Sequence, residues 1–125
     1  TFSYRGIALP GFPNLFLLYG PFSPINNSIV PIGLVQEMNY ILRVLDMARK
    51  RRSAVMPTAA ATEKFVARIR DALPGTVWVG CDNWYQDQQG NPILWPLPLD
   101  DHTELLADVD TDELEFVSVG RPALA

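Results

Sequence analysis

The feature that most constrains the fold is the run from Leu15 to Tyr19, which is apolar at every position and has turn-forming residues on both sides. A half-buried strand alternates apolar and polar residues, so this run is typical of a strand covered on both faces, as in a parallel sheet. Gly20 and Pro21 end it, because proline has no amide for the ladder and glycine tolerates unusual backbone angles. We therefore expect a strand, a tight loop and a helix, which is the geometry of ligand sites in α/β proteins. An ordinary buried strand and crossover helix is the simpler alternative.

A long helix is predicted over residues 31–52. Ser28 can cap it, and Pro31 fits its first turn because the missing amide costs little there. Apolar residues at three- and four-residue spacing predict a buried face, widened on its flanks; these residues are Leu34, Met38, Ile41, Leu45 and Ala48, with Val35, Leu42 and Val44 beside them. The basic residues 49–52 suit the negative end of the helix dipole.

Caps, turn signals and periodicity predict the remaining elements. They are, in chain order, a short strand or covering connection at 54–56, a second helix from the cap Thr58 to about Leu73, a strand at 76–79, a hairpin pairing 83–86 with 92–95, a short helix capped by Asp100 or Asp101 and ending at Ala107, and an edge strand at 114–119. The predicted fold class is α/β or α+β, with strand, long helix, short strand, second helix, β-hairpin and C-terminal edge strand.

Composition excludes several kinds of function. The 125 residues are enough for one domain, and 48% hydrophobic content argues against disorder. The net charge of −4 argues against a nucleic-acid partner, and no apolar run is long enough to span a membrane. One cysteine and one histidine cannot build a zinc or iron–sulfur site, so no metal is expected. A single cysteine also fits a reducing compartment, and we expect a cytoplasmic protein.

Two separated motifs carry a resemblance to a known family. The first contains Tyr4-Arg5-Gly6, Gly11-Phe12-Pro13-Asn14-Leu15-Phe16 and Gly20-Pro21; the second contains Gly75-Thr76-Val77-Trp78, Gly80-Cys81-Asp82-Asn83-Trp84-Tyr85, Gly90-Asn91-Pro92 and Leu94-Trp95-Pro96. In this order they resemble the C-terminal segment of FAD- and NADPH-dependent monooxygenases, the class of the Baeyer–Villiger and flavin-containing monooxygenases. The resemblance covers roughly residues 4 to 105.

The resemblance implies a parent enzyme that uses FAD, NADPH and O2 to oxygenate a small organic substrate. The sequence contains no Gly-x-Gly-x-x-Gly turn, which such cofactors require for their pyrophosphate groups. We therefore expect residues 1–125 to be a single C-terminal domain or fragment whose partner is the rest of the parent, with its dinucleotide-binding domains. Residues 1–53 would be the flavin-facing strand, loop and helix, and residues 54–125 a cover region. Alone, the fragment is expected to be inactive and to retain neither FAD nor NADP.

The resemblance also implies cofactor-binding residues in the loop after the first predicted strand. In the family this loop approaches the flavin, and the next helix points its positive end toward the flavin pyrimidine. The positions concerned are Gly20, Pro21, Phe22, Asn26, Asn27 and Ser28. Phe22 stands where many relatives have asparagine, and Asn26 and Asn27 fill a later Gly-His or Gly-Asn pair. The alternative for Asn26 and Asn27 is that they are simply turn residues.

Trp84 matches the tryptophan of the family's Asn-Ser-Trp motif, here Asp82-Asn83-Trp84. The resemblance implies a mobile position near the nicotinamide nucleotide. The alternative is a core or hairpin tryptophan that packs on Trp78 or Trp95. The catalytic residues cannot be identified from the sequence, and His102 is expected to be a surface residue at a helix start.

A different class of function also fits the sequence. The chain would then be a free-standing, non-catalytic domain derived from this family. The apolar strand at 15–19 would be buried by self-association into a homo-oligomer.

Overall fold

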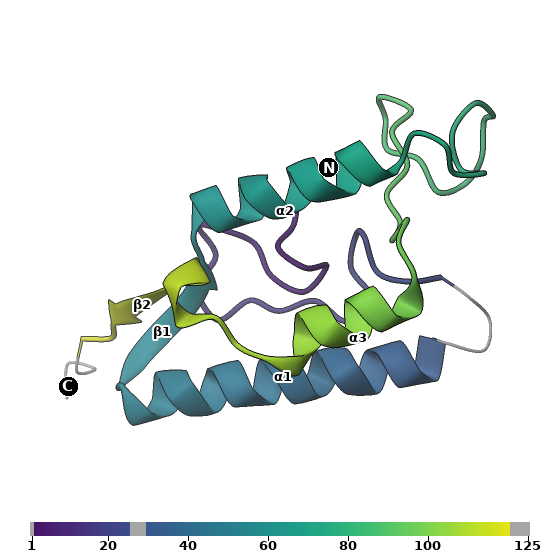
Figure 1. Ribbon diagram of the computed structural model, residues 1–125. Helices are drawn as coiled ribbons and strands as arrows, with labels where there is room; N and C mark the ends of the chain where they lie inside the picture. Colours follow the sequence, from purple (N-terminus) through teal and green to yellow (C-terminus); the bar gives the residue numbers. More distant parts are fainter. Residues whose placement is uncertain (1, 26–29, 121–125) are drawn as a thin grey trace.

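The computed structural model describes residues 2–25 and 30–120. Its elements are α1 (Val30–Lys50), β1 (Ser53–Pro57), α2 (Ala59–Ala72), α3 (Leu99–Ala107), the short 3-10 helix η1 (Thr111–Glu113) and β2 (Leu114–Ser118). Helices α1 and α2 form two sides of the molecule, α3 lies against α1, and the N-terminal segment runs between α1 and α2 (Figure 1). In the described part of the chain, no helix combines the length and the apolar character needed to cross a membrane.

The strand predicted at 15–19 is wrong. The segment has a single isolated bridge, between Phe16 and Ala8, while Leu15 is 43% and Leu18 46% exposed. Left-handed backbone angles at Asn14 (φ 60°) and Tyr19 (φ 57°) bound the run and prevent an extended strand. The apolar pattern predicted cover on both faces, but Leu15, Leu18 and Tyr19 are exposed in the described structure.

Helix α1 agrees with the predicted long helix within two residues at each end. Its predicted cap, Ser28, lies outside the described residues. Ile41, Val44 and Ala48 are buried as expected, and the rest of the buried face is formed by Gly33, Glu37 and Tyr40. The predicted face was partly wrong, because four of its apolar residues are exposed: Val35, Met38, Leu42 and Leu45. The buried face is therefore rotated away from them.

The short strand and the C-terminal edge strand are confirmed, and they pair with each other. β1 and β2 form a two-stranded antiparallel sheet whose register runs from Ser53 opposite Ser118 to Pro57 opposite Leu114. The second helix is also confirmed. The Thr58 hydroxyl accepts a hydrogen bond from the Ala61 amide at 3.1 Å and caps α2.

The segment between α2 and α3 is irregular. The strand predicted at 76–79 is wrong, because turns replace it and Gly75 and Gly80 have left-handed angles (φ 90° and 96°). The predicted hairpin is reduced to its turn and one bridge, between Gln86 and Pro92. Helix α3 ends at Ala107 as expected but begins at Leu99 after Pro98, so the two predicted aspartate caps lie inside its first turn.

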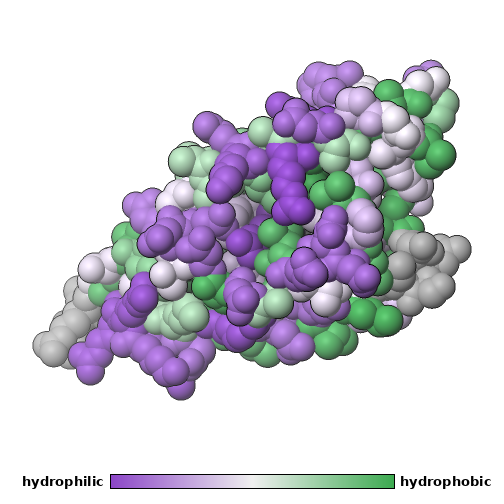
Figure 2. Space-filling view, in the orientation of Figure 1, coloured by the Kyte–Doolittle hydropathy of each residue, from purple (hydrophilic) through white to green (hydrophobic). Residues whose placement is uncertain are grey.

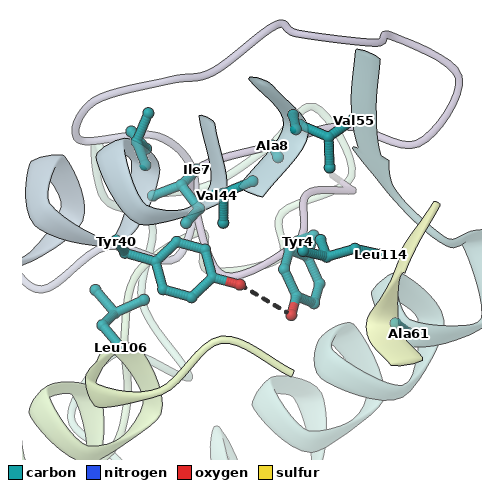
Figure 3. Close-up of a cluster of buried hydrophobic side chains, with 11 residues drawn as sticks. Tyr4, Ile7, Ala8, Tyr40, Val44, Val55, Ala61, Leu106 and Leu114 are labelled. Carbon is teal, nitrogen blue, oxygen red and sulfur yellow. Dashed lines mark hydrogen bonds between the residues drawn. The ribbon is translucent and has the colours of Figure 1, made fainter. Parts of the chain in front are cut away.

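The first of two hydrophobic clusters lies where the N-terminal segment meets α1, β1, α2, α3 and β2. Its buried residues are Tyr4, Ile7, Ala8, Tyr40, Ile41, Val44, Ala48, Val55, Ala61, Leu106 and Leu114, most of which are labelled in Figure 3. The second cluster consists of Phe22, Phe65, Val66, Ile69, Leu73 and Trp95. Together they fix the N-terminal segment between the helices.

Arg5 joins the N-terminal segment to the last third of the chain. Its guanidinium donates to the carbonyl oxygens of Leu105 (2.6 Å) and Asp108 (3.3 Å) and pairs with the Glu113 carboxylate at 2.7 Å. The same group lies over the Tyr4 ring, 5.0 Å from its centroid. We call this set of contacts the Arg5 clamp.

Candidate functional site

The 19–23 loop, which follows the apolar run and precedes α1, has a strained backbone. Tyr19 and Phe22 both adopt left-handed angles, with φ of 57° and 72°. Such angles are unusual for residues with bulky side chains, and they persist only where the surroundings impose them. The Phe22 side chain is 3% exposed and packs edge-on against Phe65 at 6.2 Å between ring centroids. The Phe22 ring therefore belongs to the core.

The N-terminal segment and residues 93–95 hold this loop from two sides. A Cβ added at Gly20 would lie 2.1 Å from the carbonyl oxygen of Gly6, so this approach requires glycine. The Ser3 hydroxyl donates to the Pro21 carbonyl at 3.0 Å. On the other side, the Phe22 amide donates to the Ile93 carbonyl at 2.7 Å, and the Trp95 amide donates to the Ser23 carbonyl at 3.3 Å.

A third support comes from α1. The carboxylate of Glu37, which is 1% exposed, accepts the Tyr19 amide at 2.8 Å and the Ser23 hydroxyl at 2.9 Å. Burial raises the pKa of Glu37, and the two hydrogen bonds oppose that rise. Glu37 was not predicted from the sequence, although one signal was present. It lies four residues after Gly33 and four before Ile41, on the buried face.

The start of α1 is suited to negative charge. Its first turn contains no acidic side chain, so the positive end of the helix dipole is not neutralised there. Gly20 and Pro21 are half-buried and belong to the same chain segment, which α1 follows. Three predicted site residues, Asn26, Asn27 and Ser28, lie outside the described residues.

Trp84 lies in the irregular segment between α2 and α3 and is 91% exposed. The alternative of a core tryptophan is wrong for the described chain, because a core position would bury the ring. The neighbouring Trp78 packs edge-on against Tyr85 at 6.0 Å, and Trp95 stacks on Phe65. Because this indole is not part of the core, it can move onto a ligand and cover it without leaving a cavity behind.

The expectation that His102 lies on the surface is also wrong. The ring is 1% exposed, packs edge-on against Trp95 at 5.2 Å, and has no hydrogen-bond partner on either nitrogen within the described structure. Burial lowers its pKa to about 4. Cys81 is exposed and free. Within residues 2–25 and 30–120, no three histidine, cysteine, aspartate or glutamate side chains gather to hold a metal.

A row of apolar residues lies on the outer surface of α1. Its members recur every three or four residues and are 37–59% exposed; they are Ile32, Val35, Met38, Leu42 and Leu45. We call them the α1 outer stripe. Further exposed apolar residues lie in the N-terminal segment, namely Phe12, Leu15, Leu18 and Tyr19. Green, hydrophobic residues appear on the surface toward the lower right of Figure 2, over the start of α1. Exposed apolar surface of this extent is typical of a contact face.

The known proteins that this chain resembles are named as monooxygenases. No family model matches the chain. It is 34% identical over 116 residues to an uncharacterised monooxygenase of Mycobacterium tuberculosis (strain H37Rv), covering 91% of this chain and 23% of that protein. It is 32% identical over 127 residues to a Baeyer–Villiger monooxygenase of Streptomyces coelicolor, covering 97% and 24%. The chain thus spans about a quarter of the length of the curated relatives it matches.

Solved structures agree on the fold. The crystal structure of cyclohexanone monooxygenase from Rhodococcus sp. Phi1 bound to NADP+ matches with a TM-score of 0.81 and 24% identity. The match covers 94% of this chain and 24% of that one. The mixed α and β arrangement described above therefore recurs as part of a much larger protein.

Proposed function

We propose, from the homology of this chain to a segment of Baeyer–Villiger and FAD-binding monooxygenases, that it is the C-terminal portion of such an enzyme. The whole enzyme would use FAD, NADPH and O2 to oxygenate a small organic substrate in the cytoplasm. When bound, the flavin supplies the redox and oxygen-transfer chemistry. The observation that carries the proposal is this homology, and the strained 19–23 loop, held from three sides, supports it.

The residues of the loop fit a flavin. The reduced ring carries negative charge on its pyrimidine side, and the start of α1 offers a positive helix end without acidic side chains in its first turn. Gly20 and Pro21, which are half-buried, would contact the ring through their backbone, and Phe22, whose side chain packs in the core, would hold them in place. Asn26, Asn27 and Ser28 would complete the loop and the cap.

Trp84 would cover the nicotinamide nucleotide. Its exposure of 91% leaves both faces of the indole available, and the surrounding segment has turns in place of strands. A large ring on such a segment can close over a ligand and exclude water. Residues 54–125 would then be the cover and residues 1–53 the flavin-facing part.

The remaining three quarters of the parent would bury the α1 outer stripe. The curated relatives contain this additional length, and the stripe faces away from the two cores of the chain. The rival function, a non-catalytic domain that self-associates, would bury the same stripe against a second copy. Sedimentation of residues 1–125 with and without Leu42→Asp tests the rival, which requires a dimer that the substitution dissolves.

The decisive experiment compares two proteins, residues 1–125 and the longest natural chain that contains them. Both are purified with added FAD, desalted, and examined by visible spectroscopy. We expect the longer chain to retain FAD and to oxidise NADPH with O2, and residues 1–125 to retain none, since they lack a pyrophosphate-binding turn. Stoichiometric flavin on residues 1–125, or a longer chain without flavin, would contradict the proposal.

A further inference from the structure

Glu37 is a buried carboxylate whose two hydrogen-bond partners both belong to the 19–23 loop. One carboxylate oxygen accepts the Tyr19 amide and the other accepts the Ser23 hydroxyl. The ion pairs of the described residues involve Arg5, Arg49 and Lys50, and none of them involves Glu37. A carboxylate without a cation is costly to bury, so its contacts with the loop must offset that cost.

These contacts are placed where the loop is strained. Tyr19 itself has a left-handed backbone, and Ser23 directly follows Phe22, the second left-handed residue. The carboxylate therefore joins both ends of the strained turn to α1, a helix of 21 residues. Strained backbone of this kind is maintained only by surrounding structure, and it is concentrated at functional sites.

We propose that Glu37 is a positioning residue that fixes the 19–23 loop in its ligand-facing conformation. The inference rests on the proposed function, which gives that loop a flavin to face. Glu37 acts through Tyr19 and Ser23 and does not itself touch the flavin. Its geometry, and not its charge, carries the effect, so an uncharged side chain of the same shape should replace it.

Glutamine provides that replacement. In Glu37→Gln the amide oxygen can accept the Tyr19 amide, and the amide nitrogen can donate to the Ser23 hydroxyl, which accepts as readily as it donates. Glu37→Leu fills the space but offers neither contact. Glu113→Leu is the matched control, because the Glu113 carboxylate also binds a distant segment, through Arg5 and Tyr4, but does not contact the loop.

The test uses the longest natural chain that contains these residues, with FAD bound. It measures hydrogen exchange at the Tyr19 amide, the visible spectrum of the flavin, and the FAD dissociation constant. We expect Glu37→Leu to speed exchange at Tyr19 and to weaken FAD binding by about tenfold to a hundredfold relative to Glu113→Leu, the range for losing the two hydrogen bonds that hold the loop. Glu37→Gln should restore both within about threefold.

Two results would overturn the inference. One is exchange and FAD binding in Glu37→Leu equal to those of Glu113→Leu; the other is a Glu37→Gln variant as impaired as Glu37→Leu, which would make the charge responsible. If Glu37→Leu does not fold, Ser23→Ala is used in its place, because it removes one contact only. It should give a smaller increase in exchange at Tyr19 and a smaller loss of FAD binding. The proposed function can fail without affecting this test. If the wild-type chain holds no flavin, hydrogen exchange at the Tyr19 amide still measures whether Glu37 fixes the loop.

Discussion

Replacing His102 with leucine tests whether a buried, unpartnered imidazole limits the stability of this chain in acid. The pKa of His102 is lowered by burial to about 4 from an ordinary value of 6.5. A base with a lowered folded pKa binds its proton first in the unfolded state. Stability is therefore complete above about pH 6.5 and is lost as the pH falls from 6.5 toward 4.

The size of the loss follows from the two pKa values. They differ by about 2.5, and each pH unit corresponds to about 1.36 kcal/mol, so His102 costs about 3 kcal/mol of stability once the pH is well below 4. At pH 4.5 most of this loss, about 2.5 kcal/mol, is already present. Leucine has nearly the volume of histidine and cannot titrate. The substitution should also be neutral or stabilising at pH 7.5, because it removes two buried nitrogens without partners.

Urea denaturation of wild type and His102→Leu at pH 7.5 and 4.5 measures the effect. The variant should gain about 2.5 kcal/mol on wild type between the two pH values. Burial raises the pKa of Glu37, which favours the folded state in acid, but Glu37 is present in both proteins and its effect cancels in the difference. Equal pH dependence of the two proteins would refute the reasoning. A loss above about 1 kcal/mol at pH 7.5 would also refute it, because it would mean that the imidazole has a partner.

Three other substitutions, two of them paired with a control variant, test the packing and the site. Ile41→Asp places a charge at a position that is 6% exposed and should cost several kcal/mol in thermal or urea unfolding, whereas Leu42→Asp, at 55% exposure, should cost less than about 1 kcal/mol in residues 1–125. Gly20→Ala forces a Cβ within 2.1 Å of a backbone oxygen and should cost about 2–4 kcal/mol; Gly11→Ala, at a left-handed backbone (φ 84°) with open space around it, should cost only about 1 kcal/mol. A loss at Gly20 no greater than the loss at Gly11 would contradict the close approach of Gly20 to the Gly6 carbonyl. Trp84→Ala should change stability by less than about 0.5 kcal/mol, because the ring is 91% exposed, and should raise the KM for NADPH in the longer natural chain. A strongly lowered melting temperature with unchanged kinetics would contradict its role as a ligand cover.

The elements with local signals could be predicted from the sequence. The start of α2 was predicted from Thr58 and the apolar residues at helical spacing after it, because capping and periodicity depend only on residues close in sequence. The strands at 53–57 and 114–118 were also identified, though their pairing was not, because register across some 60 residues leaves no local mark.

The elements that depend on what covers them could not be predicted. Leu15 to Tyr19 look like a doubly covered strand, yet Leu15 and Leu18 are exposed in the described chain. Helix α1 has apolar residues on more than one side, and periodicity alone does not decide which side faces the core. Apolar residues that form a core and apolar residues that would contact another part of a protein have the same pattern in a sequence.

The candidate site was predicted in part. Gly20, Pro21 and Phe22 were predicted through family resemblance to bind a cofactor, and this stays a prediction; the structure adds that they lie in a closely packed turn. Glu37 was missed because a glutamate on a helix is usually a solvated residue, and burial cannot be read from its identity.

The Arg5 clamp has a consequence for how the chain is made. Arg5 is bonded to residues that lie 100 to 108 positions further along the sequence. At a synthesis rate of about 5–20 residues per second, the N-terminal segment leaves the ribosome on the order of 5–20 seconds before those partners exist. Within residues 1–125, the 19–23 loop is therefore translated early and fixed late, and until then its apolar neighbours at 12–19 are free to meet chaperones or other nascent chains.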